Sequence, residues 1–281
     1  KRIKKNVKRI YFNMKSIGGF FELELSTKRE YYPNLIKLNT GRSSLEYILR
    51  AKKYKKIFLP YYICDSIIWP VKKLKINYDF YHIDKKFYPF LPKKILANEV
   101  ILYVNYFGVN DKNVRQLCKT YKNTIIDNSQ AFYVRPYKDV DTFYSPRKFF
   151  GIPDGSYLHT NILLKSNFKQ DYSALRFNHL LSRIDTTPEI SYRQFIKNEK
   201  LLSNQPIKIM SSLTQRLLQS IDYNKIKKIR KSNFIYLHDK LSKINLLKIN
   251  IKNFNCPMVY PLLVKDNGLR NYLYKNKVYS A

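Results

Sequence analysis

The sequence TIIDNSQ, from Thr124 to Gln130, decides the fold, together with SPRK at residues 145–148. A short β-branched and apolar run ends at the acid Asp127, a pattern that predicts a buried strand with a carboxylate at its end. The second stretch is a Ser-x-x-Lys sequence that runs from Ser145 to Lys148 and precedes Phe149-Phe150-Gly151. An acid, a serine and a lysine in this order indicate a candidate catalytic site.

These three residue types are what a pyridoxal phosphate (PLP) site needs. The lysine forms a Schiff base with the aldehyde, the carboxylate keeps the pyridine nitrogen protonated, and the serine hydroxyl holds the phosphate. We therefore take Lys148 and Asp127 as catalytic residues and Ser145 as a phosphate ligand. Taken singly, Asp127 could cap a following helix and Lys148 is one lysine among many, so the order of the motifs carries the prediction.

The composition allows a large globular domain, because the chain has 281 residues of which 44% are hydrophobic. No apolar run is long enough to span a bilayer, and the stretch from Ile57 to Cys64 is interrupted by Pro60. The three cysteines (Cys64, Cys118 and Cys256) form no CxxC pair, and the histidines show no ligand spacing. We expect neither disulfides nor a metal site, and a reducing cytoplasmic location.

The charge is strongly positive, with 53 Lys and Arg against 20 Asp and Glu, a net +33. This balance raises the alternative of a basic protein that binds nucleic acid or an anionic membrane surface. The lysines are spread over many segments, for example Lys52-Lys53 and Lys72-Lys73. That spread favours a solvated surface, whose field would still attract an anionic substrate such as a nucleotide diphosphate.

The first half of the chain alternates short strands with helices. This order predicts an α/β fold with a mostly parallel central sheet and flanking helices, which binds ligands at the carboxyl ends of its strands. Thr40-Gly41, Tyr61-Tyr62, Asn105-Tyr106 and Asp127 fall at those ends. The predicted strands are 35–38, 57–59, 78–83, 99–104 and 124–126, and the predicted helices are 43–51, 66–73 and 112–121.

The second half has a different character. We predict helices at 171–183, 211–220, 225–241 and 269–275, with a break at Asp185–Pro188, and strands at 246–251, 258–264 and from 278 onward. After a basic lead-in at residues 1–16, the expected domains are a large PLP-binding domain at 1–168, a helical linking segment at 169–242, and the start of a smaller α+β domain at 243–281. We expect that small domain to be incomplete, because the chain stops inside an element.

A turn before the first helix could bind the phosphate. Backbone amides and hydroxyls at Gly41 and Ser43 would meet the phosphate at the helix N-terminus, and Arg42 would add a charge-assisted contact. A plain helix cap, by Thr40 or Ser43, is the equally simple alternative.

The order of these motifs resembles the DegT/DnrJ/EryC1/StrS family of fold-type I PLP-dependent sugar aminotransferases. The resemblance covers about Gly18 to Arg230, and Asp127-Asn128-Ser129-Gln130-Ala131 is its most specific piece, similar to Asp-Ala-Ala-Gln-Ala. The other matching segments are Gly19–Glu22, Asn39–Leu45, Leu59–Tyr62, Val104–Gly108 and Lys148 with Asp154-Gly155. The chain departs from the family at Asn105, where a histidine is common, and at Arg42, where the family has a phosphate-binding threonine.

The resemblance implies a transaminase that aminates a nucleotide-linked keto sugar for surface polysaccharide biosynthesis, with glutamate as donor. It implies that Lys148 holds PLP and acts as the general base, that Asp127 holds the ring nitrogen, and that Gln130 lies near the ring oxygen. Tyr62 (or Tyr61) would stack on the ring. A homodimer is also implied. Contacts to the diphosphate are expected from Arg176, Arg183 and Arg193.

Two further alternatives stay open within this resemblance. One is a PLP-dependent sugar dehydratase, a branch in which the resemblance implies histidine in place of the lysine, so Lys148 argues against it. The other is an inactive member of the family.

Overall fold

A seven-stranded sheet forms the centre of the computed structural model, which describes residues 18–251, 255–266 and 268–280. The basic lead-in expected at residues 1–16 lies outside the described residues. The strands are β1 (Ile36–Leu38), β2 (Lys56–Pro60), β3 (Asn77–Tyr81), β4 (Glu99–Val104), β5 (Thr124–Asp127), β6 (Asp141–Tyr144) and β7 (Ser156–His159).

The sheet order is β1-β7-β6-β5-β4-β2-β3. Every neighbouring pair from β3 to β6 is parallel, whereas β7 runs antiparallel to both β6 and β1. The predicted mostly parallel α/β sheet is therefore confirmed. Strands β6 and β7 escaped prediction because their sequences, DTFY and SYLH, mix buried polar with apolar residues and show no apolar run.

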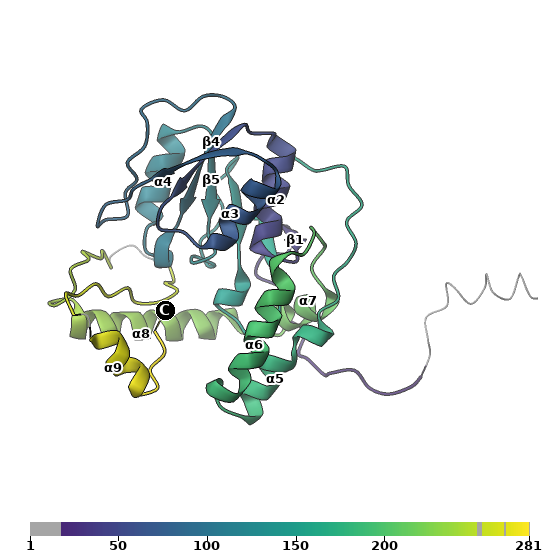
Figure 1. Ribbon diagram of the computed structural model, residues 1–281. Helices are drawn as coiled ribbons and strands as arrows, with labels where there is room; N and C mark the ends of the chain where they lie inside the picture. Colours follow the sequence, from purple (N-terminus) through teal and green to yellow (C-terminus); the bar gives the residue numbers. More distant parts are fainter. Residues whose placement is uncertain (1–17, 252–254, 267, 281) are drawn as a thin grey trace, which may run out of the picture.

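Helices cover the sheet on both sides. In Figure 1, α4 lies on one side of β4 and β5, and α2 and α3 lie on the other. Leucine, isoleucine and valine side chains from these helices are buried in one core with β2, β4 and β5. The helices α5 to α8 of the second half lie below the sheet in this view. The helices are α2 (Gly41–Lys52), α3 (Asp65–Lys73), α4 (Asp111–Thr120), α5 (Asn178–Asp185), α6 (Pro188–Ser203), α7 (Ser212–Gln219), α8 (Tyr223–Leu241) and α9 (Leu269–Lys275).

Helix α2 is fixed at its start by a cap and along its length by a buried acid. The side-chain oxygen of Thr40 accepts a hydrogen bond from the Ser43 amide at 3.1 Å, so Thr40 is the N-cap. Glu46 is buried and pairs with Arg50 at 2.5 Å and with Lys73 of α3 at 2.9 Å. The pair with Lys73 holds α3 against α2 and so positions the loop between β2 and α3.

The strands predicted at 246–251 and 258–264 are wrong. One backbone hydrogen bond, from Leu246 N to Leu263 O at 2.9 Å, links the described parts of these segments. The side-chain oxygen of Asn245 accepts from the amides of Leu247 and Leu263, both at 3.0 Å, and so takes the place of a ladder partner. Residues 278–280 are also not a strand, so the described part of the expected α+β domain contains α9 and no strand.

The single helix predicted at 171–183 is also wrong, because a short 3-10 turn (Ala174–Arg176) precedes α5 there. The break at Asp185–Pro188 is confirmed, but Pro188 starts helix α6, which was not predicted. Proline at the first position of a helix loses no hydrogen bond, so a proline can mark the start of a helix as readily as its end. Within residues 18–251, 255–266 and 268–280, no helix has the length and apolar character needed to cross a bilayer.

Candidate active site

A cavity of about 220 Å³ lies where the parallel strands end. Its wall comes from the loop after β2, the ends of β4 and β5, and the turn after β6, which is the edge at which ligands bind in such sheets. It brings together four of the predicted site residues. The lining residues are Tyr62, Ile63, Cys64, Val104, Tyr106, Asp127, Gln130 and Lys148.

Asp127 is the last residue of β5 and is 5% exposed. Its Oδ1 accepts hydrogen bonds from the Ser129 amide, at 2.7 Å, and from the Ser129 hydroxyl. Burial raises the pKa of Asp127, while the positive charge of Lys148 and the two bonds from Ser129 act in the opposite direction. Because both described bonds end on Oδ1, the second oxygen is available to the cavity.

Gln130 is held by the turn that follows β4. Its side-chain oxygen accepts a hydrogen bond from the Phe107 amide at 2.8 Å, which leaves its NH₂ as the available donor. Phe107 and Gly108 both have left-handed φ angles, 57° and 74°. The amide of Met258 donates to the Phe107 carbonyl at 2.8 Å, so the C-terminal part of the chain braces this turn.

Lys148 ends the 3-10 turn Pro146–Lys148 that follows β6. Its amide donates to the carbonyl of Ser145 at 3.2 Å, while its side chain is exposed on the cavity wall. The neighbouring Arg147 forms an ion pair with Glu199 of α6. The lysine is therefore presented by a short turn that α6 anchors from outside.

Two stacked tyrosines form the aromatic part of the wall. The rings of Tyr62 and Tyr106 lie 5.5 Å apart at 19°, and the Tyr106 hydroxyl donates to the Tyr62 carbonyl at 3.0 Å. Tyr61 points elsewhere, with its ring stacked on Phe80 at 4.9 Å. Tyr106 was not among the predicted site residues. Its place directly after β4 was the signal, since the same reasoning placed Asn105-Tyr106 at a strand end.

The predicted phosphate ligands are not on the cavity wall. Arg42 donates to the carbonyl of Leu202 in α6 at 2.9 Å, and the hydroxyl of Ser43 lies 2.9 Å from that of Thr40. Helix geometry leaves the amides of Gly41 and Arg42 without an intrahelical acceptor. The side chain of Ser145 is half-buried and does not line the cavity. Their role in phosphate binding stays a prediction.

The three arginines expected to contact a diphosphate differ in environment. Arg176 is buried, and one of its nitrogens bonds to Asp154 at 2.5 Å and to Asp171 at 2.7 Å, so it is not available to a substrate. Arg183 donates to the Thr186 carbonyl at 3.2 Å. Arg193 is exposed on α6. The expectation for Arg176 is therefore wrong, because burial requires this guanidinium to be paired within the protein.

No family model matches this sequence, and no curated protein matches it. Solved structures do match. A DegT DnrJ EryC1 StrS aminotransferase from Brucella abortus has TM-score 0.55 and 14% identity, over 86% of this chain and 69% of that one. The sugar aminotransferase CalS13 from Micromonospora echinospora has TM-score 0.58 and 13% identity, over 87% and 72%.

A structure with a different reaction also matches. The GDP-4-keto-6-deoxy-D-mannose-3-dehydratase from E. coli, solved with bound hydrated PLP, has TM-score 0.54 and 12% identity, over 86% of this chain and 71% of that one. Aminotransferases and a dehydratase thus match to a similar degree, so the fold does not separate the two reactions. At this level of identity the likeness concerns architecture, and the chain has the fold of the DegT DnrJ EryC1 StrS sugar aminotransferases.

Proposed function

We propose that this protein is a PLP-dependent aminotransferase that acts on a sugar. The observation that carries the proposal is that Lys148, Asp127 and Gln130 line one cavity at the carboxyl ends of the parallel strands. They come from the ends of two neighbouring strands, β5 and β6, and from the loops that follow. A lysine, a carboxylate and an amide on one such wall match the needs of this cofactor.

The donors and acceptors of the wall fit the ring of PLP. Asp127 has one oxygen occupied by Ser129 and the other available for a protonated ring nitrogen. Gln130 offers its NH₂ to a ring oxygen, because its own oxygen is taken by Phe107. Tyr62 is 57% exposed, so one face of its ring can receive a second ring. The backbone amides of Gly41 and Arg42, together with Ser145, would bind the phosphate.

PLP supplies an electron sink that stabilises negative charge developing next to its aldehyde carbon. The residues of this chain would do the rest. The Nζ atom of Lys148 would hold the aldehyde end and, once displaced by the amino donor, would move a proton between the two carbons that flank the transferred nitrogen. Asp127 would keep the proton on the ring nitrogen, and Tyr62 with Tyr106 would hold the ring plane.

For the substrate we propose a nucleotide-linked keto sugar, with glutamate as the amino donor and surface polysaccharide as the destination. The matching structures include a sugar aminotransferase and a GDP-sugar dehydratase. The charge of +33 would concentrate a diphosphate-bearing substrate. We favour amination over dehydration because a lysine stands at position 148.

A cytoplasmic homodimer is part of the proposal. Supporting it, α5 and α6 expose apolar side chains that a partner could cover, among them Ile184 at 80% and Ile190 at 61%. Two-fold symmetry is the commonest arrangement of soluble oligomers.

Absorbance and peptide mapping test the cofactor. Added PLP should give a visible absorbance band, and borohydride reduction followed by peptide mapping should place the pyridoxyl group on Lys148. A label on another lysine, or no band, would refute the assignment. A panel of UDP-, GDP- and dTDP-linked keto sugars with glutamate then tests the substrate. Amination of a free keto acid alone would refute the sugar while keeping the cofactor.

A further inference from the structure

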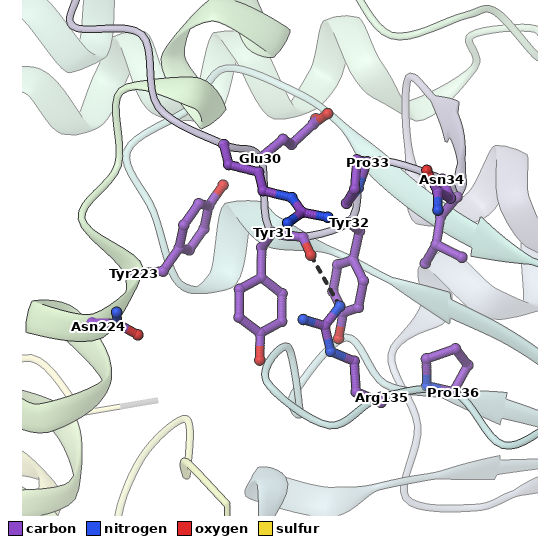
Figure 2. A pocket seen from close by; sticks show the side chains of 11 residues that line it. Glu30, Tyr31, Tyr32, Pro33, Asn34, Arg135, Pro136, Tyr223 and Asn224 are labelled. Carbon is purple, nitrogen blue, oxygen red and sulfur yellow. Dashed lines mark hydrogen bonds between the residues drawn. The ribbon is translucent and has the colours of Figure 1, made fainter.

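A second and larger cavity, of about 520 Å³, lies apart from the one at Lys148 and shares no lining residue with it. Figure 2 shows it between the segment that carries Tyr31 and Tyr32, the loop that carries Arg135 and Pro136, and the start of α8 at Tyr223 and Asn224. Its volume falls in the range of small-molecule sites.

The floor of this cavity is aromatic and rigid. The Tyr32 hydroxyl lies 2.6 Å from the Phe132 carbonyl and 2.9 Å from the Val134 carbonyl, which ties the Tyr31-Tyr32 segment to the loop after β5. The guanidinium of Arg135 lies over the Tyr31 ring at 4.2 Å and over the Tyr32 ring at 4.9 Å. Stacking of this kind fixes the plane of an arginine side chain.

Arg135 keeps donors free for a ligand. Its Nη1 donates to the carbonyl of Tyr31 at 3.0 Å, the contact dashed in Figure 2. A guanidinium has five N–H donors, so Nη2 and Nε remain. An arginine that is oriented by the protein and still has two adjacent nitrogens free to donate is suited to bidentate recognition of phosphate.

The cavity wall carries uncompensated positive charge. Within the described ranges, neither Arg29 nor Arg135 pairs with an acid, and both line the cavity. The acid in the wall, Glu30, is buried and already engaged by Lys37 and by the Tyr157 hydroxyl at 2.6 Å. The first amides of the 19-residue helix α8, at Tyr223 and Asn224, add partial positive charge, which the N-cap carboxylate of Asp222 partly offsets.

We propose that this cavity binds a phosphate-bearing anion, with Arg135 and Arg29 as its ligands. The site is separate from the one proposed for PLP, and it stands whether or not Lys148 binds a cofactor. Inorganic phosphate and a nucleoside diphosphate share the recognised group, and the cavity has room for the larger ligand.

Isothermal titration calorimetry of the PLP-saturated protein tests the site, with inorganic phosphate, UDP and uncharged uridine as probes. Arg135→Gln and Arg29→Gln should each weaken binding of the phosphate-bearing probe by roughly tenfold or more. Arg115→Gln is the matched control, because Arg115 is exposed on α4 and lines neither cavity. It should leave the affinity within about twofold, which separates the site from general attraction by the basic surface.

The results distinguish ligand sources and sites. Equal affinities for phosphate and UDP would show that the cavity recognises the phosphate group alone. Tighter binding of UDP would show that the nucleoside also contributes to binding. Equal losses in all three variants would overturn the proposal, as would uridine binding as tightly as UDP. A loss in Lys148→Gln but in neither cavity arginine would put the anion at the other cavity and overturn it without touching the proposed function. Thermal unfolding checks that each variant is folded. If Arg135→Gln does not fold, Arg29→Gln alone tests the proposal.

Discussion

Gln130 and Phe107 are joined by a hydrogen bond of 2.8 Å from the backbone amide of Phe107 to the side-chain oxygen of Gln130. The bond couples the turn after β4 to the loop after β5, which are two of the segments that line the cavity at Lys148. The same turn contains Gly108, whose φ of 74° suits glycine. The orientation of the Gln130 amide therefore depends on how tightly this turn packs.

Gly108→Ala should disturb both stability and cofactor binding. A Cβ at this position would lie 2.8 Å from the Gln130 carbonyl oxygen and 3.1 Å from that of Cys256. We expect a loss of about 1–3 kcal/mol in unfolding free energy from the strained φ and the clash, together with weaker PLP binding. Thermal unfolding and PLP titration measure the two effects.

Gly18→Ala is the matched control. Gly18 has a similar φ of +81°, but an added Cβ there would meet nothing within 4 Å. It should therefore carry backbone strain alone and leave PLP affinity unchanged. Equal effects of the two substitutions on PLP binding would contradict the role of the Phe107–Gly108 turn.

Asp127→Asn should impair turnover far more than PLP binding. The ring nitrogen would lose the charge that keeps it protonated, whereas the phosphate contacts would remain. We expect a barrier increase of roughly 4 kcal/mol or more, several orders of magnitude in kcat. Asp141→Asn is the control, since Asp141 is equally buried at the opposite end of β6 and pairs with Lys52. Near-normal kcat in Asp127→Asn would refute the assigned role.

Ser129→Ala should move the acid limb of the pH–activity profile to higher pH. Burial raises the pKa of Asp127, and the hydrogen bonds from Ser129 lower it. Removing the hydroxyl removes a lowering contact, so the pKa of Asp127 rises further and the active ionised form is lost earlier as pH falls. Profiles of kcat/KM measure the shift. Ser129→Thr, which keeps a hydroxyl, should restore the profile, and an unshifted limb in Ser129→Ala would count against ionised Asp127 as the working form.

Most of the local elements around the cavity were predictable because each carries its own signal, and β6 is the exception. The apolar run Glu99–Val104 is β4, and helix α4 at Asp111–Thr120 lies within one residue of its prediction at either end. The parallel order then requires Asp127 and the turn after β6 to meet at one edge of the sheet. That edge is where Lys148 and Asp127 line the same cavity, while their chemical roles stay predictions.

Other features could not be predicted from the sequence because they depend on contacts between segments far apart in the chain. Asn245 replaces a ladder neighbour with its own side chain, and nothing local distinguishes it from a turn asparagine. Arg42 reads as a phosphate ligand from its place at a helix start, yet its guanidinium reaches the Leu202 carbonyl in a helix far along the chain. The second cavity joins Arg29, Arg135 and Tyr223, which no spacing rule connects.

Arg176→Gln should destabilise the fold strongly, and the deficit should depend on pH. Arg176 bonds to Asp154 and Asp171, which are both buried, so its removal leaves two carboxylates without their common partner. Loss of one partner from a buried ion pair costs about 3–5 kcal/mol. The exposed pair of Arg216 with Glu22 is the control, and Arg216→Gln should cost about 0–1 kcal/mol.

The direction of the pH effect follows from Asp154. Burial raises the pKa of this carboxyl, and Arg176 lowers it, so the variant should have a still higher pKa in the folded state. A folded protein whose acid has a raised pKa binds more protons than the unfolded chain, and it gains stability relative to that chain as the pH falls. The deficit of Arg176→Gln against wild type should therefore shrink between pH 7 and about pH 4, near the pKa of an unfolded aspartate. Urea unfolding across this pH range measures the deficit. A deficit that grows toward low pH would show that Asp154 is not the buried carboxylate left unpaired by the substitution.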